Sequence, residues 1–280
     1  MNGLVGSVCR SRAHPAPLDV AAMVDARRYP IQGRSSAAVR FRDEARRRFD
    51  TDGVCVLDEF LTAAAVVAVL DDITPLLGGA YASTTYSTVY LQPADHAFPL
   101  GHPRRSEQVT RVGTLAEDQL SAGSLLRRIH ESAVFRQLIA DIVGARTLHG
   151  YADGLTSVNV LVFGAGDELG WHFDEAEYAV TLLLRPAAVG GAFEYVPNLR
   201  SDERENYPDV QEILTGGGVP RELDHPHAGC LVFFRGRHSL HRVTAVRSGG
   251  PRIAAVLSYD SEPGVRLSEH DRDLFFGRID

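Results

Sequence analysis

The sequence predicts an α+β fold in which helices pack on one face of a β-sandwich or barrel. The first half of the chain shows helical periodicity, whereas the second half shows short apolar or alternating runs separated by glycine, proline and charged residues. The helices precede the strands and do not alternate with them, which argues against a doubly wound parallel sheet. With 280 residues, 44% of them hydrophobic, the chain is long enough for one large domain.

Four helices are expected in the front half, and most are bounded by a glycine or a capping residue. They span residues 37–49, 62–77, 125–129 and 133–143. The first ends at Asp52-Gly53, Thr62 caps the second, and Gly144 stops the last. Residues 55–57 form a short strand between the first two helices.

Six runs in the back half are expected to be strands. They lie at residues 157–163, 178–184, 192–196, 230–234, 240–246 and 253–259. The interval 198–226 is too long for a turn, so we interpret it as an insertion with a short helix at 207–214, which is typical of a lid. Residues 1–35 lack periodicity and are expected to form a loosely ordered arm, followed by a single domain over 36–280.

Charge and cysteine content narrow the class of protein. The net charge of -7 argues against nucleic acid as the main partner. Cys9, Cys55 and Cys230 are widely spaced and form no C-x-x-C motif, so neither a disulfide framework nor a zinc knuckle is indicated, and a reducing cytoplasm is expected. No apolar run approaches the roughly 20 residues that span a bilayer, and no signal-peptide core begins the chain, so no membrane association is expected. Composition gives no indication of the oligomeric state.

The segment 170–174, Gly-Trp-His-Phe-Asp, holds the strongest chemical pattern. Residues two apart in a strand share a face, so His172 and Asp174 can bind one metal ion while Phe173 points into apolar packing. One further ligand completes a facial triad with open positions. His241, 67 residues after Asp174, is the expected third ligand, and His238 is its main competitor.

Arg252 follows His241 by 11 residues and begins an apolar strand. An arginine there can form a two-pronged contact with a carboxylate in an otherwise apolar pocket. A 2-oxo acid cosubstrate needs this arrangement, because its keto-carboxylate end chelates the metal and its distal carboxylate requires a fixed cation.

His-x-Asp, a distant histidine and an arginine about ten residues later together resemble the Fe(II)/2-oxoglutarate-dependent oxygenase superfamily. The resemblance implies a double-stranded β-helix core over about residues 151–264. It also implies that His172, Asp174 and His241 form the catalytic iron site, that Arg252 holds the C5 carboxylate of 2-oxoglutarate, and that O2 is the oxidant. Many members carry a hydroxyl residue two positions after this arginine, where this chain has Ala254.

Two residues are candidates to replace that missing hydroxyl as a second contact to 2-oxoglutarate. They are Thr181 and Asn159. The alternative for Asn159 is that its side chain only forms a hydrogen bond at the edge of its strand.

Four segments resemble, more narrowly, the branch that contains free-amino-acid halogenases and their hydroxylase relatives. They are residues 102–105, 170–174, 190–197 and 234–243. In the halogenases glycine replaces the acidic ligand and opens a position for chloride, so Asp174 argues against chlorination here. The branch implies a zwitterionic amino-acid substrate and a role in natural-product biosynthesis.

A desolvated zwitterion needs a cation for its carboxylate and an acceptor for its ammonium group. Arg104 or Arg105 is expected to meet the carboxylate and Glu175 the ammonium, while Phe275 and Phe276 close the pocket as the resemblance implies. The alternatives are a solvated arginine pair, a glutamate facing water, and plain core contacts for the two phenylalanines.

The expected function is therefore oxidation of an unactivated C–H bond of a small substrate, with hydroxylation as the main reaction. Desaturation or oxidative cyclisation by the same site is an alternative. A redox-inactive cupin-type enzyme, such as an isomerase or hydrolase, would keep the metal triad but give Arg252 no cosubstrate. A sandwich-fold binding protein with incidental histidines is the non-enzymatic alternative.

Overall fold

A computed structural model describes residues 19–223 and 226–280. The helical elements of this part of the chain are α1 Val20–Met23, α2 Ser36–Asp52, α3 Ala63–Ile73, η1 Thr74–Gly79, η2 Glu117–Gln119, α4 Leu125–Glu131, α5 Ala133–Val143, α6 Tyr207–Leu214 and α7 Glu269–Phe276. The strands are β1 Val54–Leu57, β2 Tyr81–Ser87, β3 Gln108–Leu115, β4 His149–Gly150, β5 Val158–Phe163, β6 Leu169–His172, β7 Tyr178–Arg185, β8 Val189–Gly190, β9 Phe193–Val196, β10 Arg221–Glu222, β11 Leu231–Phe234, β12 Leu240–Val243, β13 Val246–Ser248 and β14 Arg252–Asp260.

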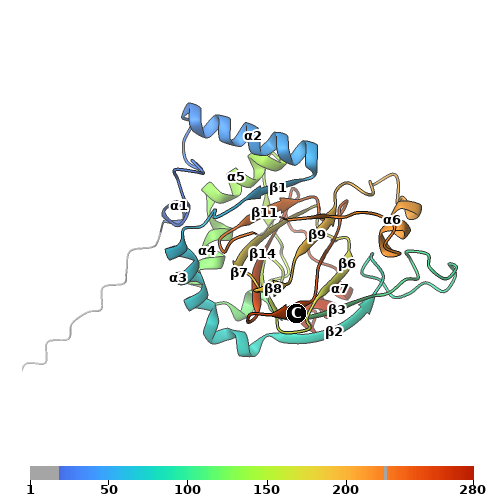
Figure 1. Ribbon diagram of the computed structural model, residues 1–280. Helices are drawn as coiled ribbons and strands as arrows, with labels where there is room; N and C mark the ends of the chain where they lie inside the picture. The colour runs from blue at the N-terminus through green and yellow to red at the C-terminus, as the bar shows by residue number, and fades with distance from the viewer. Residues whose placement is uncertain (1–18, 224–225) are drawn as a thin grey trace, which may run out of the picture.

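Two antiparallel sheets form the centre of the molecule. The larger has eight strands in the order β1-β11-β7-β14-β5-β3-β2, with β4 paired to β14, and the smaller has the order β10-β9-β12-β6. A separate two-stranded ribbon joins β13 to β8. Figure 1 shows α2 to α5 gathered on one side of the strands and α6 on the opposite side. The predicted α+β fold with a double-stranded β-helix core is confirmed.

Alternation along β14 explains why the large sheet is buried on both faces. Ile253, Ala255, Leu257 and Tyr259 belong to the core shared with helices α2 to α5. The residues that alternate with these point into the space between the sheets and line the main cavity. They are Arg252, Ala254, Val256 and Ser258. One face of β14 therefore packs against the helices, and the other face contributes side chains to the cavity.

The helix boundaries follow the expected capping residues. Thr62 Oγ1 accepts a hydrogen bond from the Ala65 amide at 3.2 Å, and Gly53 and Gly144 end α2 and α5 with φ values of 68° and 81°. The second helix ends earlier than expected, at Ile73, and continues as a 3-10 helix. Pro75 explains this change, since proline has no amide hydrogen and disfavours the α conformation in the residue before it.

Three further differences separate the expected elements from the structure. The run 240–246 is two strands, because β12 pairs in the small sheet whereas β13 pairs with β8. Strands β2 and β3 escaped prediction, since β2 is a largely exposed edge strand of serine, threonine and tyrosine without an apolar stripe. Helix α7 was also missed, although its cap Ser268 is followed three residues later by an acid.

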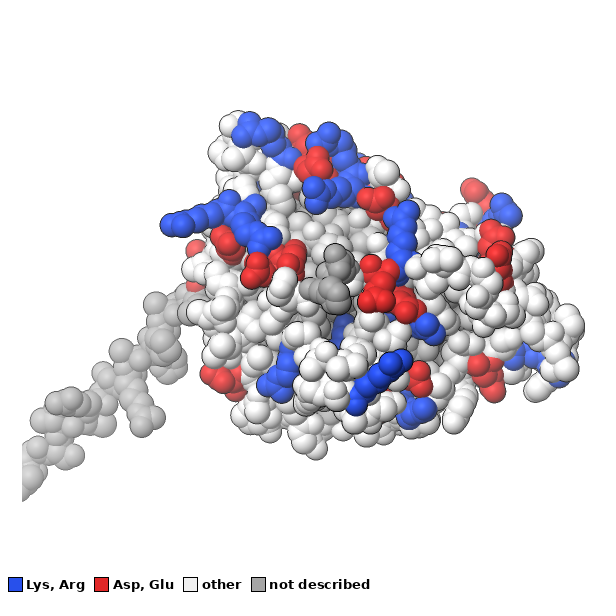
Figure 2. Space-filling view, viewed as in Figure 1, with Lys and Arg blue, Asp and Glu red and all other residues white. Residues whose placement is uncertain are grey.

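The described part of the expected arm, residues 19–35, packs against the core. Val20, Met23 and Ile31 are buried in the same cluster as the helices, so this part is not loosely ordered. Cys55 and Cys230 are free and buried, and Cys9 lies outside the described residues. None of the described helices is long and apolar enough to cross a membrane. Figure 2 shows basic and acidic side chains interspersed over the face drawn.

Candidate metal centre

His172 and His241 are direct partners across two antiparallel strands. β6 ends at His172, and its register with β12 places His241 opposite. Their ring centroids lie 4.1 Å apart, and Oδ1 of Asp174 lies 3.4 Å from Nε2 of each imidazole. The ligand atoms of the three residues fall within 4.8 Å of one another, a grouping that can hold a metal ion. The three expected ligands therefore meet at one point.

The two imidazoles are held in the same way. Nδ1 of His172 bonds the Gly170 carbonyl at 2.8 Å, and Nδ1 of His241 bonds the Ser239 carbonyl at 2.9 Å. A carbonyl only accepts, so each Nδ1 carries the hydrogen and each Nε2 keeps a lone pair. Hydrogen bonds of this kind orient histidine ligands and make them more basic. Both Nε2 atoms are thus prepared to bind a metal ion.

The pKa shifts of His172 and Asp174 suit metal binding as well. Burial lowers the pKa of His172, the neighbouring His241 lowers it further, and Asp174 only partly offsets this. Burial opposes ionisation of Asp174, but the two imidazoles outweigh it and hold the pKa of the carboxyl well below its usual range. Two imidazoles and one carboxylate form the donor set of a non-haem Fe(II) facial triad.

Phe173 lies between the two ligands in sequence and points the opposite way, as the strand pattern predicted. Its side chain is 2% exposed, stacks on Tyr90 with ring centroids 5.7 Å apart, and packs under the guanidinium of Arg200 at 4.2 Å. Its amide donates to the Val89 carbonyl at 2.8 Å. This packing fixes the backbone from which both ligands project.

Arg252 is a buried guanidinium that has no carboxylate partner in the described chain. It is 6% exposed and lies over the Phe163 ring at 5.3 Å. Burial lowers its pKa to about 10, so it stays charged at neutral pH. An uncompensated buried charge is costly, and an anionic ligand would remove that cost. Arg252 lines the same cavity as the triad.

Asn159 and Thr181 also line this cavity. Both are register partners of Val256, one on each side of β14, so the three form a row across the sheet. This row lies four residues from Arg252 along β14, roughly 13 Å at the rise of a strand. The side-chain amide of Asn159 has only a long bond of 3.5 Å to the Thr156 carbonyl. Both residues line the cavity, and their contact with 2-oxoglutarate stays a prediction.

The expected substrate contacts divide into two groups. Glu175, Phe275 and Phe276 line the cavity, with Glu175 largely exposed to solvent. Arg104 and Arg105 do not line it. Nε of Arg104 donates to the Tyr207 hydroxyl at 2.8 Å, and Arg105 donates to the Phe98 carbonyl at 2.9 Å. Arg104 therefore connects its loop to the predicted helix α6, whereas Arg105 stays within that loop, and neither provides the expected cation in the cavity.

His238, the competing third ligand, lies outside the triad. Its Nε2 bonds Oδ1 of Asp202 at 3.0 Å near the surface. His241 instead packs edge-on to Phe234 with ring centroids 4.6 Å apart, inside the cavity.

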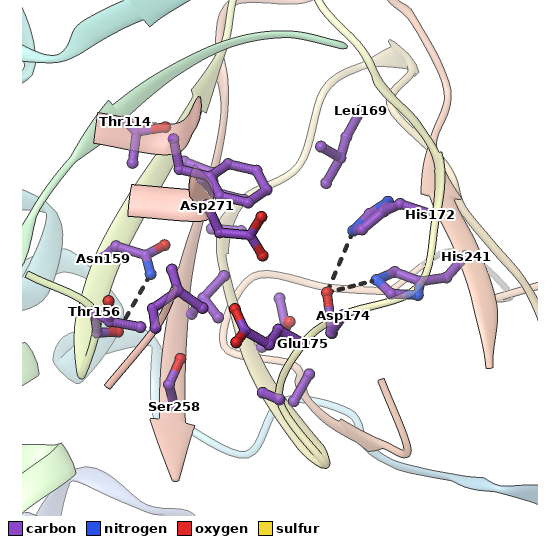
Figure 3. A pocket seen from close by; sticks show the side chains of 18 of the residues that line it. Thr114, Thr156, Asn159, Leu169, His172, Asp174, Glu175, His241, Ser258 and Asp271 are labelled. Atoms are coloured by element: carbon purple, nitrogen blue, oxygen red, sulfur yellow. Dashed lines mark hydrogen bonds and ion pairs between the residues drawn. The ribbon is translucent and has the colours of Figure 1, made fainter. Parts of the chain in front are cut away.

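Several cavity residues escaped the sequence reasoning. Figure 3 shows Thr114, Thr156, Ser258 and Asp271 around the space in front of the imidazoles. Three of them have a buried oxygen without a hydrogen-bond partner, namely Thr114, Thr156 and Asp271. The spacing of Ser268 and Asp271, which is typical of a helix cap, was a signal that could have indicated the helix carrying Asp271.

Comparison with known proteins places the chain in a family. The family model described as Halogenase D matches residues 38–273. A search of curated proteins finds no match. Several solved structures share the fold at low identity.

The carbocyclase SnoK from nogalamycin biosynthesis, a non-haem α-ketoglutarate-dependent enzyme, is 18% identical, with 82% of this chain and 89% of that chain covered and a TM-score of 0.56. A prolyl hydroxylase from Trichoplax adhaerens, in complex with a peptide of hypoxia inducible factor, is 17% identical over 81% and 94% of the two chains, with a TM-score of 0.53. A 2OG-Fe(II) oxygenase family protein from Burkholderia pseudomallei is 15% identical over 80% and 93%, with a TM-score of 0.50.

These structures confirm the predicted fold, and the family match confirms the predicted resemblance to the oxygenase superfamily and its halogenase-containing branch. The donor set of the triad agrees with the predicted iron, and the unpaired Arg252 with the predicted 2-oxoglutarate. The match extends over most of the chain, from before β1 into α7. The chain belongs to the Halogenase D family.

Proposed function

We propose that the protein is an Fe(II)- and 2-oxoglutarate-dependent oxygenase that hydroxylates an unactivated C–H bond of a small substrate, a free amino acid. The observation that carries the proposal is one cavity that combines a His/Asp/His triad with a buried guanidinium that has no carboxylate partner among the described residues. The triad would bind the metal ion, and the guanidinium would bind the distal carboxylate of the cosubstrate.

Iron, 2-oxoglutarate and O2 would together supply the oxidising power that replaces a C–H bond by C–OH, with succinate and CO2 as coproducts. The residues of the chain determine where this happens. His172, His241 and Asp174 would hold the metal through one face, while Arg252 orients the cosubstrate from the end of β14. Phe193 and Phe234 pack around His241 and keep water from that side of the site.

Asp174 favours hydroxylation over chlorination. Its Oδ1 is equidistant from the two Nε2 atoms, so its carboxylate would occupy the coordination position that chloride would need on a metal held by the triad. The family match alone does not decide between these reactions, because the branch includes both halogenases and hydroxylases. A role in natural-product biosynthesis and a cytoplasmic location stay predictions.

The test combines iron binding with product analysis. Wild-type protein is expected to bind one Fe(II) per chain, and His172→Ala is expected to lose it. With 2-oxoglutarate, O2 and a panel of free amino acids, at least one amino acid should stimulate succinate formation and gain one oxygen atom by mass spectrometry. Loss of two hydrogens would indicate desaturation or cyclisation instead. Metal binding without any succinate would contradict the oxygenase and favour a redox-inactive enzyme.

A further inference from the structure

The fold does not hold the three ligands of the candidate metal centre in the same way. His172 ends β6, and His241 lies in β12 between β6 and β9, so the backbones of both histidines belong to the small sheet. Asp174 lies two residues beyond the end of β6, outside the ladder of that sheet. The position of its carboxylate therefore depends on contacts that the sheet does not supply.

The turn 235–239, which leads into β12, supplies hydrogen bonds to the backbone around Asp174. The Asp174 amide donates to the Gly236 carbonyl at 3.0 Å. The Arg237 guanidinium donates to the carbonyl of the next residue, Glu175, at 3.0 Å from Nε and 2.8 Å from Nη2. The backbone on both sides of the Asp174 side chain is thus bound to this turn, so a displacement of the turn would move the carboxylate.

Arg200 binds the same turn from the segment 198–206. Its Nε donates to the Arg237 carbonyl at 2.6 Å, and its own amide donates to the His238 carbonyl at 3.2 Å. Its side chain is 15% exposed, and Nη1 donates to Oε2 of Glu205 at 3.2 Å. Because the guanidinium is planar and has partners in two directions, its orientation is fixed, and it holds the turn in one place.

The same guanidinium packs on Phe173, the residue directly before Asp174. Cζ of Arg200 lies 4.2 Å from the centroid of the Phe173 ring and 5.4 Å from that of Tyr90. A cation over an aromatic face is attracted by the ring, and the attraction grows where water is excluded, as it is around the 2% exposed Phe173. Arg200 thus contacts both the residue before Asp174 and the turn that binds the Asp174 amide.

We propose that Arg200 is a positioning residue for the carboxylate ligand: by holding Phe173 and the turn 235–239 together, it sets the place where Asp174 meets the two imidazoles. This inference rests on the proposed function, because it requires that the triad binds the metal ion. Arg200 does not line the cavity, so it acts on the metal only through these neighbours. Without it, the two histidines stay paired across β6 and β12, whereas the carboxylate is free to move.

The first test measures binding of Co(II), whose visible absorption depends on the number and geometry of its ligands. Arg200→Met keeps an unbranched side chain and removes the guanidinium. This variant should bind Co(II) about tenfold more weakly than wild type or worse, the range found when groups that support metal ligands are changed. Its Co(II) spectrum should shift from that of wild type toward that of Asp174→Ala. Wild-type affinity together with a wild-type spectrum overturns the proposal.

The second test repeats Arg200→Met in the Asp174→Ala background. There the change should lower Co(II) affinity by less than about twofold, because the ligand that Arg200 positions is already absent. A merely structural role would lower the affinity by the same factor in both backgrounds, and that result refutes the inference. Arg200→Lys keeps the charge beside Glu205 but cannot stack a planar group on Phe173, so the same pair of measurements with lysine decides the matter if Arg200→Met does not fold.

Arg204→Met is the matched control, since Arg204 is an exposed arginine of the same segment whose guanidinium donates to Oδ1 of Asn206. It should keep the wild-type affinity and spectrum. An equal loss in this variant would mean that the charge of the segment, and not the contacts of Arg200, is responsible. Failure of the wild-type protein to bind Co(II) and Fe(II) would overturn the proposed function, whereas normal binding in both wild type and Arg200→Met would overturn only the present inference.

Discussion

The α-carbon of Gly236 lies against the carboxylate of Asp174. A Cβ added to Gly236 would overlap Oδ2 of Asp174 and come within 2.8 Å of its Cγ. The Gly236 carbonyl also accepts from the Asp174 amide at 3.0 Å. Gly236 therefore fixes the metal ligand both by its hydrogen bond and by having no side chain.

Gly236→Ala should weaken iron binding by about tenfold or more, the range found when groups that support metal ligands are changed. The added methyl pushes the carboxylate away from the point where the imidazoles converge. Titration with Fe(II) measures this affinity. Gly123→Ala is the control, because an added Cβ there meets nothing within 4 Å. Equal iron affinity in both variants would show that the carboxylate has room to move.

Arg252→Met should have opposite effects on stability and on cosubstrate binding. Removing a buried charge without a partner stabilises the metal-free protein or leaves its stability unchanged. The same change should weaken 2-oxoglutarate binding at least about tenfold while iron still binds. Thermal unfolding with and without 2-oxoglutarate measures both effects. Arg252→Lys should be intermediate, and an unchanged cosubstrate requirement in both variants would refute the role of the guanidinium.

Phe173→Ala should destabilise the protein by about 3–5 kcal/mol, because it opens a cavity behind the metal ligands. The ring is 2% exposed and contacts Tyr90 and Arg200. Urea unfolding measures the change. Val219→Ala serves as the control, since Val219 is 92% exposed and its truncation should have little effect. A loss under 1 kcal/mol would mean that the backbone of the ligands is held by other contacts.

His130 should make the protein less stable in acid. Burial lowers its pKa to about 4, while Nε2 bonds the Ser258 carbonyl at 3.0 Å and the ring stacks on Tyr259. The unfolded chain takes up a proton near pH 6.5, but the folded chain resists it until about pH 4. Stability attributable to this residue is therefore complete above pH 6.5 and falls by about 3 kcal/mol as the pH drops to 4.

His130→Gln removes this titration, so its free energy of unfolding should depend less on pH between 6.5 and 4 than that of wild type. Urea unfolding across this range measures the two slopes. Parallel slopes would indicate that His130 takes up its proton at the same pH in the folded and the unfolded chain.

The sequence by itself determined the layers of the fold and predicted the three residues that meet in the candidate metal triad. Helical and two-residue periods depend on local geometry, so they predicted α2, α5 and most back-half strands close to their observed limits. The spacing of His172 and Asp174 depends equally on strand geometry. Periodicity did not predict the exposed edge strand β2, because few of its side chains are buried and it therefore has no apolar stripe.

Only the tertiary structure decided which distant residues share the cavity. His241 lies opposite His172 because β12 pairs with β6, and Asp271 of α7 lines the same cavity as Glu175, which stands 96 positions earlier in the chain. Arg104 and Arg105 are excluded by their contacts to Tyr207 and Phe98. Such pairings follow from strand register and loop packing, which bring together residues whose order along the chain does not reveal their contacts.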